Sequence, residues 1–102
     1  MIHVVAHIGT KPGQREAVLR EFAQIVPVVR AEKGCIEYVP VIDAEGAGAI
    51  TTPLGPDSFA VVEKWATMAD LQAHAAAPHM AAYGARVRDM IASRAVHVLS
   101  AA

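Results

Sequence analysis

Apolar and polar residues alternate along residues 2–8 with a period of two, which is typical of a β-strand. Between residues 14 and 32 the period changes, and apolar residues recur at spacings of four, three and four. This spacing predicts a helix with one apolar face, formed by Val18, Phe22, Ile25 and Val29. Pro27 lies within this helix and should bend it, and Gly34 is suited to end it.

Two further strands are predicted at residues 35–42 and 58–66. Pro40 cannot donate a hydrogen bond to a neighbouring strand, so the first of these strands should lie at a sheet edge or carry a bulge. Residues 43–57 contain three Gly and two Pro but few large apolar residues. They predict a long loop, and loops of this length in compact domains are often functional.

A second helix is predicted to open at Thr67, because Thr67 and Asp70 resemble a capping box. Pro78 should divide this helix, and its second part is expected to run to about residue 92. Residues 94–100 alternate again and predict a fourth strand.

The predicted order is strand, helix, strand, strand, helix, strand. This order is typical of the α+β, ferredoxin-like βαββαβ arrangement, with one four-stranded antiparallel sheet. Right-handed crossovers place the first and third strands at the centre of that sheet. We expect residues 1–102 to form a single domain, since the chain contains no linker or low-complexity segment.

The amino-acid composition indicates which kinds of macromolecule the protein binds. Hydrophobic residues make up 54% of the chain and charged residues 19%, which is a high apolar content for a small domain with much surface to cover. Excess apolar surface usually ends in an interface, so we expect an oligomer. The net charge of −1 and the absence of a basic cluster argue against a nucleic-acid partner.

Cys35 is the only cysteine, which excludes an internal disulfide and a metal site made of cysteines alone. The first eight residues are already predicted as a strand, so a signal peptide is not expected. No apolar stretch approaches the ~18 residues of a membrane span. A reduced, cytoplasmic protein without membrane association is the simplest expectation.

Residues able to perform chemistry gather in two neighbouring segments, 59–65 and 71–83. The first holds Glu63 and the only tryptophan, Trp65, on a predicted strand. The second holds His74, His79 and Tyr83 on a helix that Pro78 interrupts. We therefore expect the functional site where this strand and this helix meet.

Four stretches in this order resemble the antibiotic biosynthesis monooxygenase (ABM) superfamily, and most closely its quinol-monooxygenase-like branch. They are "KPGQREAVLREF", "EKGCIEY", "VVEKWAT" and "HAAAPHMAAY". The resemblance implies a dimeric α+β barrel in which two ferredoxin-like sheets face each other. It also implies a small apolar pocket in each subunit, and oxidation of a small aromatic or quinone-type substrate by dioxygen with no metal, flavin or haem cofactor.

A pocket histidine could accept the proton of a quinol or phenol as the substrate is oxidised, because a neutral imidazole is a competent base near pH 7. We place His79 first for this role and His74 second. Glu63 lies among apolar neighbours on its strand, and a buried carboxylate needs a partner. The expected partner is His74 or His79, in a pairing that is either structural or orients the base.

Other residues are expected to contact the substrate. Trp65 and Phe59 are candidate apolar walls, although Trp65 could equally be a core or interface aromatic. Tyr83 shares a helix face with His79, and Arg86 follows three residues later. His7 on the first strand is expected to reach the pocket beside Trp65, or else to be a histidine satisfied within the sheet.

Alternatives remain open. A metal site is disfavoured, because the spacing of His74 and His79 is not that of a helical zinc pair. A Pro–His helix break also occurs in an isomerase of the same superfamily, so an isomerase or lactone-processing enzyme is the second hypothesis. Haem binding is disfavoured, because Tyr83 stands where haem-binding relatives carry an axial histidine. A non-catalytic stress protein that binds a small molecule is the last candidate.

Overall fold

The computed structural model describes residues 1–102. Its strands are β1 (Ile2–Thr10), β2 (Cys35–Val41), β3 (Ser58–Trp65) and β4 (Ile91–Leu99). Its helices are α1 (Arg15–Arg30), α2 (Met68–Ala75) and α3 (Pro78–Val87), with short 3₁₀ turns at Gly48–Ile50 and Arg88–Met90. None of the helices combines the length and the apolar character that crossing a membrane requires.

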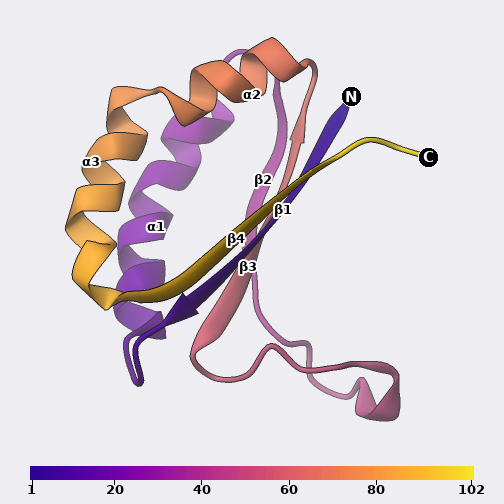
Figure 1. Ribbon diagram of the computed structural model, residues 1–102, viewed down its shortest axis with the longest axis vertical. Coiled ribbons are helices and arrows are strands. Elements are labelled where there is room, and N and C mark those ends of the chain that lie inside the picture. The colour runs from indigo at the N-terminus through magenta and orange to yellow at the C-terminus, as the bar shows by residue number, and fades with distance from the viewer.

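The four strands form one antiparallel sheet in the order β2-β3-β1-β4, which confirms the predicted ferredoxin-like arrangement (Figure 1). β1 and β3 occupy the centre, as expected. β2 lies at one edge, where Pro40 is tolerated, because a strand pairs there on one side only.

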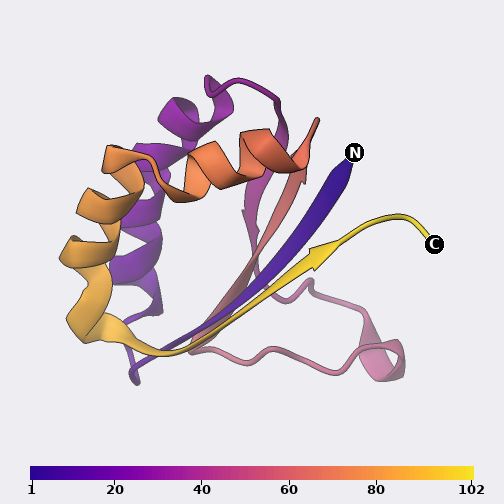
Figure 2. The same ribbon diagram turned by 45° about the horizontal axis from the view of Figure 1, so that its top comes forward.

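All three helices lie on the same side of the sheet (Figures 1 and 2). Alternate residues of each strand therefore face the helices, and the others face the opposite, open side. The register pairs Ala6 with Val61 and with Val96 on the helix side. The next rung pairs Val5 with Val62 and with His97, so these three residues lie on the open face.

Phe22 of α1 lies at the centre of the core. Its ring is 5.3 Å from that of Tyr38, 6.0 Å from that of Phe59 and 5.7 Å from that of Tyr83. The four predicted apolar positions of α1 are all buried, so the spacing identified the correct face. Because its aromatic contacts come from β2, β3 and α3, Phe22 joins the helix layer to the sheet.

Two turns place α2 close to the start of β2. Thr67 caps α2 as predicted, since its hydroxyl accepts a hydrogen bond from the Asp70 amide at 3.1 Å. Gly34 has a φ of 79°, and a Cβ atom at this position would collide with the Asp70 carboxylate. Only glycine therefore allows α2 to approach the α1–β2 turn this closely.

The predicted end of the second helix near residue 92 is wrong. Two separate helices, α2 and α3, flank the break at Pro78, and α3 ends at Val87. β4 begins earlier than predicted, at Ile91, because this residue pairs with Thr10 of β1. Lys11 also donates a backbone hydrogen bond to the Met90 carbonyl at 2.9 Å, which fixes the chain at this corner.

Candidate active site

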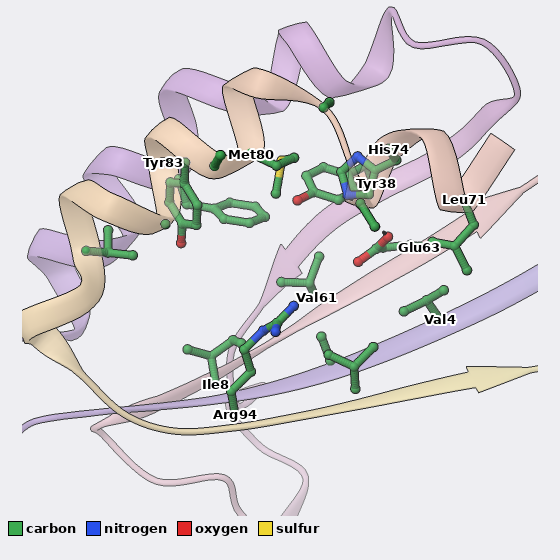
Figure 3. A pocket seen from close by; sticks show the side chains of 18 of the residues that line it. Val4, Ile8, Tyr38, Val61, Glu63, Leu71, His74, Met80, Tyr83 and Arg94 are labelled. Carbon is green, nitrogen blue, oxygen red and sulfur yellow. Dashed lines mark ion pairs between the residues drawn. The ribbon is translucent and has the colours of Figure 1, made fainter.

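A cavity of about 580 Å³ lies between the sheet and the helices (Figure 3). Most of its wall is aliphatic, and α2, α3 and the segment between them contribute small residues. The apolar lining includes Val4, Ala6, Ile8, Val61, Leu71, Ala75, Ala76, Ala77, Met80, Ala81, Val87 and Val96. A space of this size and character suits a small apolar or aromatic molecule.

Six side chains bring polar atoms to this wall: Tyr38, Glu63, His74, Tyr83, Arg88 and Arg94. Burial raises the pKa of Tyr83 to about 12, and it raises the pKa of Tyr38 as well. Both phenols therefore keep their protons at neutral pH and can donate hydrogen bonds. Arg94 projects from β4 toward the cavity, and its guanidinium takes part in none of the ion pairs of the structure (Figure 3).

His74, on the last turn of α2, is the imidazole on the cavity wall. Its side chain is only 7% exposed. The ring lies 4.7 Å from the Trp65 ring and 5.4 Å from the Tyr38 ring, which hold it between two aromatic groups. Its Nε2 atom is 4.0 Å from Oε1 of Glu63. The structure thus brings the two predicted residues His74 and Glu63 together at the cavity.

Glu63 is buried on β3, but its hydrogen-bond partner is not the one expected. The indole Nε1 of Trp65 donates to Oε1 of Glu63 at 2.9 Å, whereas the Nε2 atom of His74 lies beyond hydrogen-bond distance. Burial raises the pKa of the Glu63 carboxyl, and the Trp65 hydrogen bond and the charge of His74 oppose this effect only in part.

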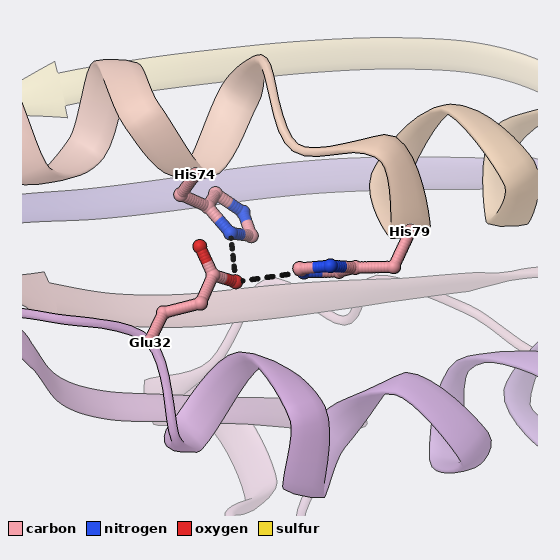
Figure 4. A group of neighbouring side chains, drawn as sticks. All are labelled: Glu32, His74 and His79. Atoms are coloured by element: carbon pink, nitrogen blue, oxygen red, sulfur yellow. Dashed lines mark hydrogen bonds and ion pairs between the residues drawn. The ribbon is translucent and has the colours of Figure 1, made fainter.

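Glu32, in the turn after α1, is the first residue of the stretch "EKGCIEY" but was not among the predicted site residues. Its Oε2 atom lies 2.9 Å from Nδ1 of His74 and 3.0 Å from Nε2 of His79 (Figure 4). Three segments therefore meet at one carboxylate oxygen. One ligand atom from each of the three residues lies within 4.8 Å of the others, so this is the group of side chains that could hold a metal ion.

His79 contacts Glu32 and does not line the cavity. Its side chain is 30% exposed, against 7% for His74. The face of α3 that lines the cavity carries Met80, Tyr83, Gly84 and Val87, which have helical spacing. Tyr83 therefore lies where it was predicted, whereas the geometry does not support placing His79 ahead of His74 as the group that meets a substrate.

Two predicted walls lie behind the cavity lining. Trp65 and Phe59 are fully buried and are not lining residues. Trp65 supports the ring of His74 and donates to Glu63, and Phe59 packs edge-on against Phe22. Both are core aromatics that support the site from beneath; this was the alternative interpretation of Trp65, whereas the placing of Phe59 on the cavity wall is corrected.

His7 and Arg86 lie away from the cavity. The neighbours of His7 in β1, Ala6 and Ile8, line the cavity, so the His7 side chain faces the open side of the sheet. The expectation that His7 reaches the pocket is therefore wrong. Arg86 forms an ion pair with Glu21 of α1 at 2.9 Å and is not a lining residue.

The sequence of the chain matches a protein family and a curated relative over most of its length. Residues 1–86 match the family model described as "Antibiotic biosynthesis monooxygenase". The chain is 42% identical over 101 residues to the "Probable quinol monooxygenase YgiN" of Escherichia coli K12, covering 97% of this chain and 96% of that protein.

Solved structures show the same architecture. A crystal structure of an antibiotic biosynthesis monooxygenase superposes with a TM-score of 0.82 at 23% identity, covering 100% of this chain and 99% of that one. PA3566 from Pseudomonas aeruginosa gives 0.80 at 24% identity, with 99% and 93% covered. At 23% and 24% identity these structures establish only that the fold is shared. Family membership is established by the family model and by the relative at 42% identity. The chain belongs to the antibiotic biosynthesis monooxygenase family.

Proposed function

We propose that the protein is a cofactor-independent monooxygenase that oxidises a small quinol or polyphenol with dioxygen inside the cavity. His74 is the base that removes a proton from a substrate hydroxyl. One observation carries this assignment: an imidazole stands on the wall of a largely apolar cavity of about 580 Å³, next to the buried carboxyl of Glu63. The quinol named in the description of YgiN also supports this class of substrate.

In this reaction the substrate supplies all the electrons that reduce dioxygen. One oxygen atom enters the substrate, which loses two hydrogen atoms, and the other oxygen atom leaves with those hydrogens as water. Deprotonation by His74 gives an electron-rich anion that transfers an electron to dioxygen more readily than the neutral quinol does. The proton held on His74 is then available to the oxygen atom that leaves as water. The apolar wall keeps the two reactants together.

The other polar groups of the wall suit such an anion. Arg94 has no ionic partner within the protein, so its charge is available to a deprotonated hydroxyl. Tyr83 keeps its proton, because burial raises its pKa to about 12, and it can donate a hydrogen bond to a substrate oxygen. An anionic oxygen on the substrate would thus meet a cation and a neutral donor.

The proposal includes a homodimer in which the open faces of two sheets pack together and leave the helices outside. The open face carries no helix, and Val5 and Leu99 on it are 38% and 47% exposed. Apolar surface of this kind favours an interface. Since the cavity lies on the opposite side of the sheet, each subunit would keep its own cavity.

Oxygen consumption is the test of the proposed reaction. The purified protein should accelerate oxygen uptake in the presence of a menadiol-like quinol, and treatment with a chelator should leave the rate unchanged. No acceleration across a panel of quinols would contradict the proposal. A rate lost to the chelator and restored by a divalent metal would instead make Glu32, His74 and His79 a metal centre.

Gly84→Leu tests whether the reaction takes place in the cavity. Gly84 lines the cavity, and a Cβ atom added there would meet nothing within 4 Å. A leucine should fill space that the substrate needs and raise KM roughly tenfold or more, the usual effect of misfitting a small group. Ala85→Leu is the matched control, because Ala85 is the exposed next residue of α3 and does not line the cavity. Equal kinetics in the two variants would place the reaction elsewhere.

A further inference from the structure

We infer that Glu32 is a positioning residue for His74: it determines which ring nitrogen of His74 faces the cavity and stabilises the imidazolium that forms when His74 accepts a proton. His79 holds Glu32 in place through the same oxygen atom. This inference rests on the proposed function, in which His74 is the base. It gives roles to a glutamate that was noted only as the first residue of the stretch "EKGCIEY" and to a histidine that does not line the cavity.

The first step concerns hydrogen-bond chemistry. An ionised carboxylate can only accept hydrogen bonds, so at 2.9 Å from Oε2 of Glu32 the Nδ1 atom of His74 must carry the hydrogen. In a neutral imidazole the other nitrogen, Nε2, then holds the lone pair. Nε2 is the atom on the Glu63 side of the ring, 4.0 Å from Oε1. Glu32 therefore turns the basic nitrogen of His74 away from the α1–β2 turn and toward the cavity wall.

The second step is electrostatic. A proton transferred to Nε2 makes His74 a cation, and its charge then lies beside the Glu32 carboxylate. The two side chains are 7% and 16% exposed, so water screens the pair weakly and their attraction is stronger than it would be at the surface. A carboxylate placed behind an imidazole base in this way both orients the ring and stabilises its charged form.

The third step explains His79. In one continuous helix, residue 79 would lie roughly 140° around the axis from residue 74, so the two side chains could not meet at one point. The break at Pro78 separates α2 from α3 and brings both rings to Oε2 of Glu32 (Figure 4). Because His79 donates at 3.0 Å from the start of α3, it fixes the carboxylate from a second direction.

Several titratable groups surround His74. Glu32 faces it from the α1–β2 turn, Glu63 from β3 and Tyr38 from β2, while His79 of α3 lies across Glu32. Cys35 stands at the start of β2, and its thiol pKa is raised by burial first and then by the charges of Glu32 and Glu63. Glu32 is the only one of these groups that forms a hydrogen bond with His74.

Steady-state kinetics of Glu32→Gln test the inference. The glutamine can still accept from Nδ1 but carries no charge to stabilise the imidazolium. We expect kcat to fall roughly 10²-fold, at the lower end of the contribution of a general base, with KM little changed. The acidic limb of the pH profile of kcat/KM should move to lower pH, a shift that a merely structural residue would not cause. Glu32→Asp should recover part of the rate.

Two controls make the result specific. Glu16→Gln removes a carboxylate from the first turn of α1, on a side chain that is 72% exposed, and should leave kcat and the pH profile unchanged. In a His74→Gln background, Glu32→Gln should cost less than about twofold, because residues that act through one another are not additive. An equal loss in both backgrounds would overturn the inference.

Nuclear magnetic resonance of the histidine ring nitrogens provides a test without turnover. In the unaltered protein His74 should carry its hydrogen on Nδ1 at neutral pH, and Glu32→Gln should lose this strong preference. If His74 carries its hydrogen on Nε2 in the unaltered protein, the inference is wrong, whether or not quinols are oxidised. If the expected tautomer is found but no quinol supports oxygen uptake, the proposed function fails and the positioning contact stands.

Discussion

The two faces of the sheet carry similar residues but offer different chemistry. Both faces combine valines with ionisable side chains, and three of the five histidines, His3, His7 and His97, lie on the open face. On the helix face, α2 and α3 enclose a cavity and bring His74 against buried aromatic rings and carboxylates. On the open face no second layer is present, and the histidines have no carboxylate partner.

This difference teaches that a histidine of this protein obtains buried, hydrogen-bonded surroundings only where the helices cover the sheet. From its position on a strand among apolar residues, His7 was a reasonable candidate for a pocket residue. The surroundings of His74 nevertheless come from four segments: Glu32 follows α1, Tyr38 lies on β2, Trp65 ends β3, and His79 of α3 holds Glu32. Burial together with a fixed carboxylate partner distinguishes the candidate base His74 from the histidines of the open face.

Removing one histidine from each face gives the largest expected contrast. His74→Gln should lower kcat by roughly 10²- to 10⁴-fold, the usual contribution of a general base. His7→Gln should change it by less than about threefold, because His7 faces away from the cavity. Oxygen uptake with a menadiol-like quinol measures both, and circular dichroism checks that both variants fold. Comparable losses would remove the functional distinction between the faces.

A charge on the open face tests its proposed role as an interface. Val5 is 38% exposed at the centre of this face, and Val5→Asp would place two like charges in a symmetric interface. The species in solution should fall from twice 10.8 kDa to 10.8 kDa, as measured by light scattering at micromolar concentration. Met68→Lys alters another exposed apolar residue, on α2, and should leave the mass unchanged. A monomer in the unaltered protein would refute the interface.

The smallest expected effect concerns Glu63, the buried carboxyl on the helix face. Burial raises the pKa of this carboxyl in the folded protein, so folding favours its protonated form. The protonated carboxyl therefore stabilises the fold at pH values below the ordinary pKa of glutamate. This stabilisation is lost as the pH rises through the raised pKa of the folded protein. Glu63→Gln keeps an oxygen for the Trp65 indole and does not ionise. Relative to the unaltered protein, its free energy of unfolding should therefore increase as pH rises from acidic to neutral.

Urea unfolding at several pH values measures this difference. Glu37→Gln is the control, because Glu37 pairs with Lys64 at the partly exposed edge of the sheet, and any difference should be small and show no such trend. A stability difference for Glu63→Gln that is flat with pH, or that has the opposite sign, would contradict the raised pKa.

The elements were predictable from sequence because each depends on local periodicity. The apolar spacing of α1, the alternation of β1 and the Thr67 cap identified their elements without tertiary information. The end of α3 was missed, since Ile91 is drawn into β4 by pairing with Thr10, a residue far away in sequence. Local patterns do not contain that contact.

The site was predictable only in part. Chemistry was expected where 59–65 meets 71–83, and His74, Glu63 and Tyr83 do line a cavity there. The rotation of α3 after the Pro78 break depends on how α3 packs against α1 and the sheet, so the side that His79 faces could not be deduced. Glu32 was missed because its importance arises only when α2 and α3 approach the turn after α1. Arg94 does share the inward face of its strand with Val96, which is a signal that could have been used.

The contact between the Trp65 and His74 rings gives the protein a built-in optical probe. Trp65 is the only tryptophan, so all indole emission comes from one ring that lies 4.7 Å from the candidate base and donates a hydrogen bond to Glu63. A change in the charge of either neighbour, or an aromatic molecule entering the cavity beside them, alters the surroundings of that ring. Fluorescence under anaerobic conditions can therefore report occupancy of the cavity while no oxygen is being consumed.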